Sequence, residues 1–266
     1  MRPIPVPFDV FSLSLDGNET YIRDQLMVDI TGWATFRHAI GTGTDSSLLT
    51  NTGTGSIPDN VKSMYCEFGP NHYHAICCLG DSKRLILGSN LRTSAAPLEV
   101  HHTLMSFYQS LGSVLDSLAR IIYSLIVVDA ATAVKGTPAR YKRNMTDWGK
   151  VLQLANLGGF APICNSPAID NVRSVRNALT HGWMTIARAD NHGELHWPHE
   201  IETEREIPWP HDPSSRALFS LNYTNWTPIA LFLQRHYTII EQTTGAVFLE
   251  AVNHISQFEA RHHIQI

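Results

Sequence analysis

The chain has 266 residues, of which 43% are hydrophobic, and it carries a formal net charge of −4. This length and composition suit one large domain, or one domain with an appendage, and exclude a disordered or fibrous protein. The negative charge excludes a globally basic nucleic-acid binder, so any contact with RNA or DNA has to come from a local patch.

Residues 1–96 are predicted to form an N-terminal β-rich region of unknown role. The first eleven residues hold three prolines and no apolar core, so we expect no signal peptide there. Helical periodicity is not sustained in this region, and short strand-like runs alternate with turn-rich segments. The runs are FDVFSLSL (8–15), MYCEF (64–68), HAICCLG (74–80) and RLILG (84–88). Four cysteines are too few for a disulfide scaffold, which favours a reduced, cytoplasmic setting.

No metal site and no cofactor are predicted. The stretch NHYHAICC (71–78) brings histidines and cysteines together, as a zinc site would. However, adjacent cysteines do not chelate as a C-x-x-C pair does, and on a strand they face opposite ways. We therefore expect a half-buried strand at 71–78. His196 and His199 likewise have no evident partner set for a metal.

From Pro97 onward the pattern is helical. Apolar residues repeat every three or four positions and predict a long core helix over about 101–130. A second, shorter helix is predicted near 145–157, with Thr146 or Asp147 as its N-cap and Gly158 and Gly159 as its end.

The third helix is predicted to span 167–187. Ser166 is its expected N-cap, and Pro167 lies in its first turn. A buried stripe on this helix is formed by apolar residues at helical spacing, namely Val172, Val175, Leu179 and Ile186, with Trp183 beside it.

The remainder of the chain predicts a β-hairpin, a loop and a last helix. The hairpin covers 184–197 and turns near Asn191-His192-Gly193. A proline-rich loop (207–213) leads to a helical region over about 226–262. We therefore expect a mainly α fold, in which residues 97–266 form a helix bundle with an inserted hairpin. The longest apolar stretch, 121–128, is too short to span a membrane, so no membrane partner is expected.

The candidate catalytic residues lie in the third helix. Arg173, Asn177 and His181 follow one another at four-residue spacing, in a row that points away from the buried stripe. Arg176 flanks this row, and its long side chain can bring a guanidinium alongside His181. The Arg176–His181 spacing alone is common, but here the pair lies on a capped, amphipathic helix. The same row also suits a merely solvated face.

The segment RNALTH (176–181) resembles the Arg-polar-x-x-x-His motif of the HEPN superfamily. This resemblance, over about 97–262, implies a four- to five-helix bundle with the motif near the start of its third core helix. Active members are metal-independent ribonucleases, frequent in toxin–antitoxin and antiviral systems, and they usually dimerise so that two motifs face one cleft. By position, the resemblance implies Arg176, Asn177 and His181 as the catalytic set. It also implies an RNA substrate, a homodimer and, in some systems, a regulatory partner protein.

These residue types fit RNA cleavage by transesterification. A histidine titrates near neutral pH and can move the proton of the 2′-hydroxyl or of the leaving oxygen. An arginine can bind the charged oxygens of the transition state, and Asn177 can bind the phosphate or orient the imidazole. The alternative is a non-catalytic HEPN-like module that senses a ligand or binds a partner in a defence or regulatory complex.

Two further groups are candidate supports. Asp116 and Arg120 lie one turn apart among apolar residues of the first predicted helix. We expect Asp116 and Arg173 to contact the catalytic residues of the motif and to hold them in position. The segment 131–146 holds four basic residues and no acidic one, and it suits either an RNA-backbone patch or an ordinary solvated loop. These basic residues are Lys135, Arg140, Lys142 and Arg143.

Overall fold

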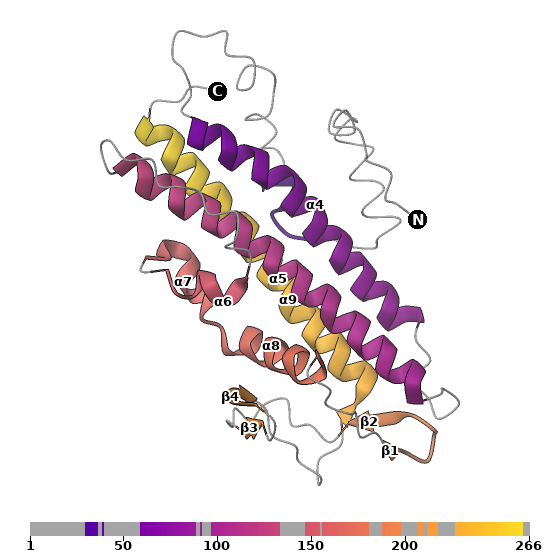
Figure 1. Cartoon of the computed structure of the whole chain (residues 1–266). Helices are drawn as coiled ribbons and strands as arrows, with labels where there is room; N and C mark the ends of the chain where they lie inside the picture. The colour runs from indigo at the N-terminus through magenta and orange to yellow at the C-terminus, as the bar shows by residue number, and fades with distance from the viewer. Residues whose placement is uncertain are drawn as a thin grey trace, which may run out of the picture.

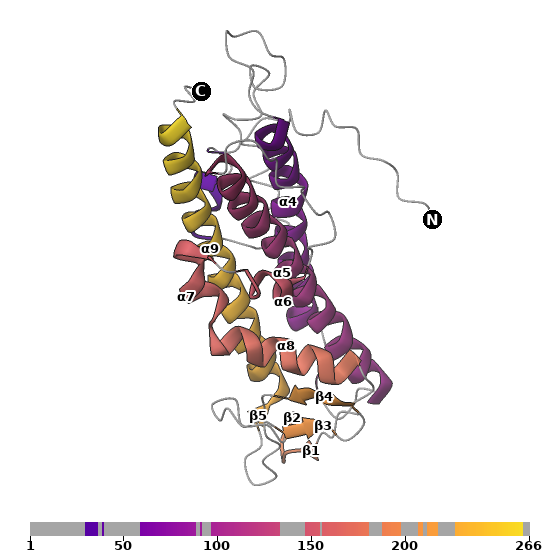
Figure 2. The same ribbon diagram turned by 60° about the vertical axis from the view of Figure 1, so that its left-hand side comes forward.

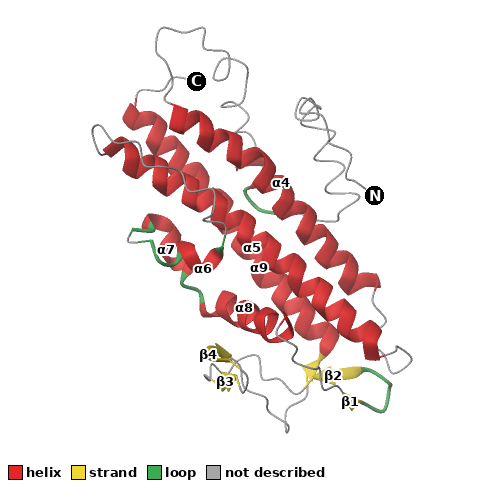
Figure 3. Ribbon diagram, viewed as in Figure 1, coloured by secondary structure: helices red, strands yellow, loops and turns green. Residues whose placement is uncertain are grey.

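The computed structural model describes most of the chain from residue 59 onward and little of it before. The described residues are 30–36, 39, 59–88, 91, 97–133, 147–154, 156–180, 188–197, 207–209, 212–217 and 227–262. They are mainly helical, as predicted (Figure 3). Three long helices run side by side, α4 (Asp59–Gly88), α5 (Pro97–Ala133) and α9 (Ile229–His262) (Figure 1). No helix in this part of the chain is both long enough and apolar enough to cross a membrane.

Helix α5 is the centre of the bundle and confirms the predicted helix over 101–130. It lies between α4 on one side and the shorter helices α6 and α8 on the other, and it also packs along α9 (Figures 1 and 2). Its apolar residues at three- and four-residue spacing are buried, as in Leu104, Phe107 and Leu111. The last predicted helix (226–262) is likewise confirmed as α9.

Helix α4 corrects the strands predicted at 64–68, 74–80 and 84–88. These runs, and the half-buried strand expected at 71–78, form one helix of 30 residues. Its buried face includes His72 and Ser82, which interrupt the apolar repeat in the sequence. Both side chains bond within the helix, since His72 Nδ1 donates to the Phe68 carbonyl (2.8 Å) and Ser82 Oγ to the Cys78 carbonyl (2.9 Å). Because these side chains form hydrogen bonds to carbonyl groups of the same helix, the helix can bury both polar residues.

The predicted boundary between residues 96 and 97 does not isolate α4 from the bundle. Buried residues of α4 such as Phe68 and Leu79 belong to the same core as those of α5 and α9. The prediction of a β-rich N-terminal region is therefore wrong for 59–88. The run predicted at 8–15 lies outside the described residues.

The predicted hairpin is confirmed. Strands β1 (Arg188–Ala189) and β2 (Leu195–Trp197) pair antiparallel, with Ala189 opposite Leu195. Gly193 closes the turn at φ 75°, a backbone conformation that glycine adopts most easily. Strand β5 (Thr227–Pro228) pairs with the other edge of β2 and leads directly into α9, so the sheet order is β1-β2-β5.

The proline-rich segment 207–213 was predicted as a loop but forms part of a second hairpin. Strands β3 (Ile207–Trp209) and β4 (Asp212–Ala217) pair antiparallel, with a register shift at Pro208 and Trp209. A proline has no N–H for the ladder, but it is tolerated at such an irregularity or at an edge of a sheet. Strand β4 lies against α8, and the β1–β2 hairpin lies at the end of the bundle where α9 begins (Figures 1 and 2).

The second helix is shorter than predicted. Asp147 is its N-cap, as expected, but α6 (Trp148–Val151) ends after one turn, well before Gly158. The chain then forms a 3₁₀ turn, η3 (Gly158–Phe160), and the short helix α7 (Ala161–Cys164). The Asn156 side chain accepts a hydrogen bond from the N–H of Gly158, whose φ is 53°, and this turn replaces the helix that propensity favoured.

The third helix, α8 (Pro167–Thr180), begins where predicted. The Ser166 carbonyl accepts the N–H of Asp170, which places Ser166 at the N-cap position. Val172, Val175 and Leu179 are buried and confirm most of the predicted stripe. The predicted end of the helix, with Trp183 and Ile186, lies outside the described residues.

Candidate functional site

A polar pocket of about 100 Å³ lies between α5, the start of α6 and α8. All three elements contribute charged or polar side chains to it. Its lining residues are Gly112, Leu115, Asp116, Asp147, Trp148, Val172, Arg173, Arg176 and Asn177. Asp147 and Asn177 are exposed, so the pocket reaches solvent on their side. The pocket therefore combines two arginines, two carboxylates and an amide in one small space.

Arg176 lies against the backbone of α5 at Gly112. Its Nε, Cδ and Cζ atoms lie 2.6, 2.9 and 3.0 Å from the position that a Cβ on Gly112 would take. Arg176 Nε and the Trp148 indole Nε1 are both buried and have no hydrogen-bond partner among the described residues. Two residues of the pocket wall thus each carry a buried N–H donor without a hydrogen-bond partner among the described residues. A buried donor without a partner is costly, which makes such atoms candidates for binding a ligand.

Asp116 lies one helical turn after Gly112 and lines the same pocket. Burial raises the pKa of its carboxyl group, while the Arg176 guanidinium opposes this shift and Asp147 adds to it. The carboxylate also accepts a hydrogen bond from the Trp148 backbone N–H, which ties α5 to α6. Arg120, in contrast, points to α4, where its Nη1 lies 3.5 Å from Asn71 Oδ1.

Arg173 and Asn177 are also on the pocket wall. Arg173 Nη1 donates to Asp170 Oδ1 (3.0 Å), one turn earlier on α8. Arg173 Nη2 lies 2.8 Å from where a Cβ on Gly149 would stand, so a second glycine leaves room for a second arginine. The exposure of Asn177 confirms its predicted place on the helix surface.

Several predicted site residues lie outside the described part of the chain. His181 follows the last described residue of α8, and the basic segment with Lys135, Arg140, Lys142 and Arg143 falls within 134–146. The sequence alone did not identify Gly112 and Trp148 as parts of the site. A glycine inside an otherwise apolar helix often marks a place where another part of the chain packs close to the helix backbone, and Gly112 could have been recognised in this way.

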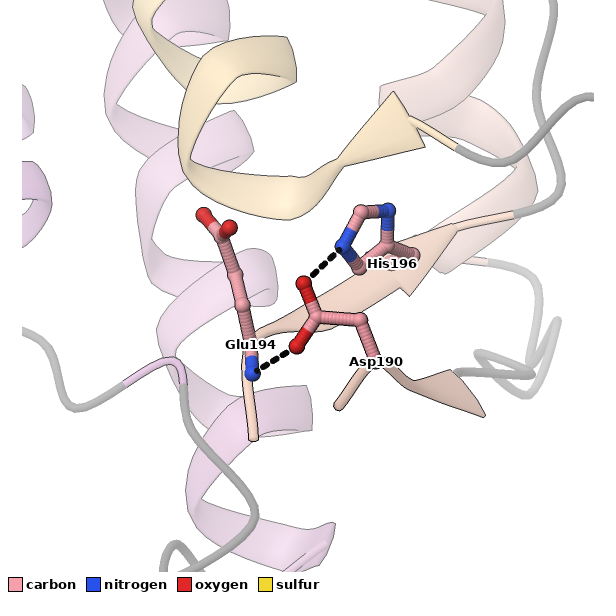
Figure 4. A group of neighbouring side chains, drawn as sticks. All are labelled: Asp190, Glu194 and His196. Atoms are coloured by element: carbon pink, nitrogen blue, oxygen red, sulfur yellow. Dashed lines mark hydrogen bonds and ion pairs between the residues drawn. The ribbon is translucent and has the colours of Figure 1, made fainter. Parts of the chain in front are cut away.

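A second polar group lies at the β1–β2 turn (Figure 4). Asp190 Oδ1 accepts the backbone N–H groups of His192 (2.8 Å) and Glu194 (2.9 Å). Its Oδ2 lies 3.1 Å from His196 Nε2. These contacts, with the Glu194 N–H first among them, lower the pKa of the Asp190 carboxyl group. The sequence showed no partner residues for His196, but the structure places its imidazole beside the Asp190 carboxylate.

One ligand atom each from Asp190, Glu194 and His196 lies within 4.8 Å of the others, the only such trio found among the described residues. Two carboxylates and an imidazole are ligands that can bind a zinc ion. However, Asp190 already uses both oxygens, one to close the turn and one to hold His196. These hydrogen bonds account for the group as a brace of the hairpin.

Comparison with known proteins does not assign a function to the pocket. Comparison of the chain with protein families, curated proteins and solved structures finds no match. The resemblance of 176–181 to the HEPN motif therefore stays a prediction, and the function has to be inferred from the chemistry of the pocket.

Proposed function

We propose that the protein is a metal-independent endoribonuclease of the HEPN type, with its active site at the pocket between α5, α6 and α8. The observation that carries the proposal is the place of Arg176. Its guanidinium lies in a small polar pocket, and its buried Nε has no hydrogen-bond partner among the described residues. An arginine held in this way offers a fixed donor to a phosphate group.

Each residue of the motif has a distinct task in this proposal. His181 moves the proton of the attacking 2′-hydroxyl or of the leaving 5′-oxygen. Arg176 binds the phosphate oxygens on which negative charge gathers in the transition state. Asn177, exposed at the pocket, donates a hydrogen bond to the phosphate or orients the His181 ring. The resemblance further suggests a toxin or antiviral effector under the control of a partner protein.

Cleavage of RNA by the purified protein should persist in EDTA. The expected products carry a 2′,3′-cyclic phosphate or a 3′-phosphate, because the 2′-hydroxyl is the nucleophile and His181 and Arg176 supply the chemistry. The measurement is incubation with total RNA with and without EDTA, followed by analysis of the new 3′ ends. Activity that disappears with the chelator and returns with magnesium or manganese would contradict the proposal.

The protein should be a homodimer in solution, with the α8 helices of the two protomers facing each other. A single His181 supplies one proton-transfer group, whereas the reaction uses both a base and an acid. A two-fold axis beside the motif supplies both from one gene product. Light scattering coupled to size exclusion measures the mass directly. A monomer that cleaves RNA at every concentration tested would refute the dimeric site.

A non-catalytic interaction module is the second candidate. The closeness of Arg176 to Asp116 of α5 also suits a helix held in place for packing. The two candidates differ in what they require of His181, since an enzyme needs its imidazole and a scaffold does not. Partner binding that survives loss of His181, in a protein that never cleaves RNA, would favour the module.

A further inference from the structure

Gly112 stands at a place on α5 where the Arg176 side chain lies close against the helix. The helix runs from Pro97 to Ala133, so Gly112 is far from either end. A Cβ at this position would lie 2.6 Å from Arg176 Nε and 2.9 Å from its Cδ. Both distances are shorter than any ordinary van der Waals contact, so a side chain here requires Arg176 to move.

A glycine inside a helix is less stable than an alanine, because it gains more freedom when the chain unfolds. No turn or positive φ requires a glycine at position 112, since the residue is within regular helix. What the glycine provides is space for the guanidinium. The same turn of α5 carries Asp116, which faces Arg176 and is itself held by the Trp148 backbone N–H.

We propose that Gly112 is a positioning residue for Arg176, forming with Asp116 a socket on α5 that fixes the guanidinium in the pocket. The glycine sets how close the guanidinium approaches α5, and the carboxylate sets the side toward which it turns. The role of this socket in catalysis rests on the proposed nuclease function. The placing of Arg176 by Gly112 does not depend on that function and can be measured separately.

The test is Gly112→Ala, with two readouts. In the first, the Arg176 Nε–H signal in a ¹⁵N NMR spectrum, assigned by its loss in Arg176→Lys, is expected to exchange slowly with water in the wild type. It should shift and exchange faster in Gly112→Ala. In the second, the kcat for RNA cleavage should fall by ~10-fold or more with a smaller change in KM, because the displaced donor serves the transition state.

The double variant Gly112→Ala/Arg176→Ala separates positioning from damage to the fold. It should cleave RNA no more slowly than Arg176→Ala and melt at no lower temperature, because the atoms that the new methyl group meets have been removed. Gly88→Ala is the matched control, since nothing lies within 4 Å of a Cβ there. It should leave both readouts unchanged.

Each outcome bears on one statement. If the wild type does not cleave RNA, the nuclease function fails, while the NMR signal still decides whether Gly112 places Arg176. An Arg176 Nε–H signal that is the same in Gly112→Ala and the wild type overturns the socket. A signal that moves while kcat stays unchanged overturns its catalytic role. A double variant that is less active or less stable than Arg176→Ala overturns it as well, because Gly112 then acts through something other than Arg176.

Discussion

Replacing His181 with alanine is expected to lower the rate of RNA cleavage by ~10²-fold or more, the usual loss when a positioned acid–base group is removed. No other side chain of the RNALTH segment titrates near neutral pH, so nothing within the motif can take over the proton. The measurement is the single-turnover rate on a short RNA at saturating enzyme, which reports the chemical step and not the release of product.

His102→Ala is the control for this experiment. His102 is an exposed histidine on α5, ten residues before Gly112 and so about 15 Å from it along the helix axis. The control should cleave RNA at the wild-type rate, and both variants should keep the wild-type circular dichroism spectrum. Undiminished cleavage by His181→Ala would remove the residue from the mechanism and leave the interaction module as the better candidate.

The long helices α5 and α9 could be predicted because their apolar repeat is sustained over many turns. In α5, leucines and other apolar residues recur at three and four positions, and each of these faces packs against a neighbouring helix. The β1–β2 hairpin was predictable from its Asn-His-Gly turn, in which Gly193 takes the left-handed conformation. Here local chemistry and tertiary packing favour the same structure.

Helix α4 could not be predicted in this way, because its stability comes from contacts that the sequence does not show. Gly69-Pro70 has the composition of a turn, and Pro70 removes one helical hydrogen bond. Polar residues of α4 find partners on α5, as in the contact of His74 Nδ1 with Ser117 Oγ (2.8 Å). Packing along α5 compensates for the weak local preference.

Some features of the candidate site were likewise predictable from local sequence, and others were not. The position of Arg173 and Asn177 on one face of α8, with Arg176 flanking it, follows from helical periodicity and was predictable. The meeting of Arg176 with Gly112 and Asp116 was not, because these residues are about sixty positions apart and their contact depends on how α8 crosses α5. Asp116 was selected only because an acidic residue among apolar neighbours needs a partner.

Arg176→Ala is expected to lower the rate of RNA cleavage by ~10²–10³-fold, the typical cost of losing one fixed donor to a transition-state charge. Arg176→Lys is the informative companion. It keeps the positive charge but loses the Nε–H and the planar fork, so it should restore only a small part of the activity. Arg84→Ala, which removes an exposed arginine of α4 outside the pocket lining, should cleave RNA as the wild type does.

The stability of Arg176→Ala should depend on pH, through Asp116. Burial raises the pKa of this carboxyl group and Arg176 opposes the shift, so removing the arginine should raise the pKa further. A carboxyl group whose pKa is higher in the folded state than in the unfolded state destabilises the fold when it is ionised, and this effect disappears as it becomes protonated. The fall in Tm caused by Arg176→Ala should therefore be larger at pH 7 than near the ordinary aspartate pKa of 3.8. A fall in Tm that is the same at both pH values, or Arg176→Lys cleaving RNA at the wild-type rate, would show that the guanidinium does not act as proposed.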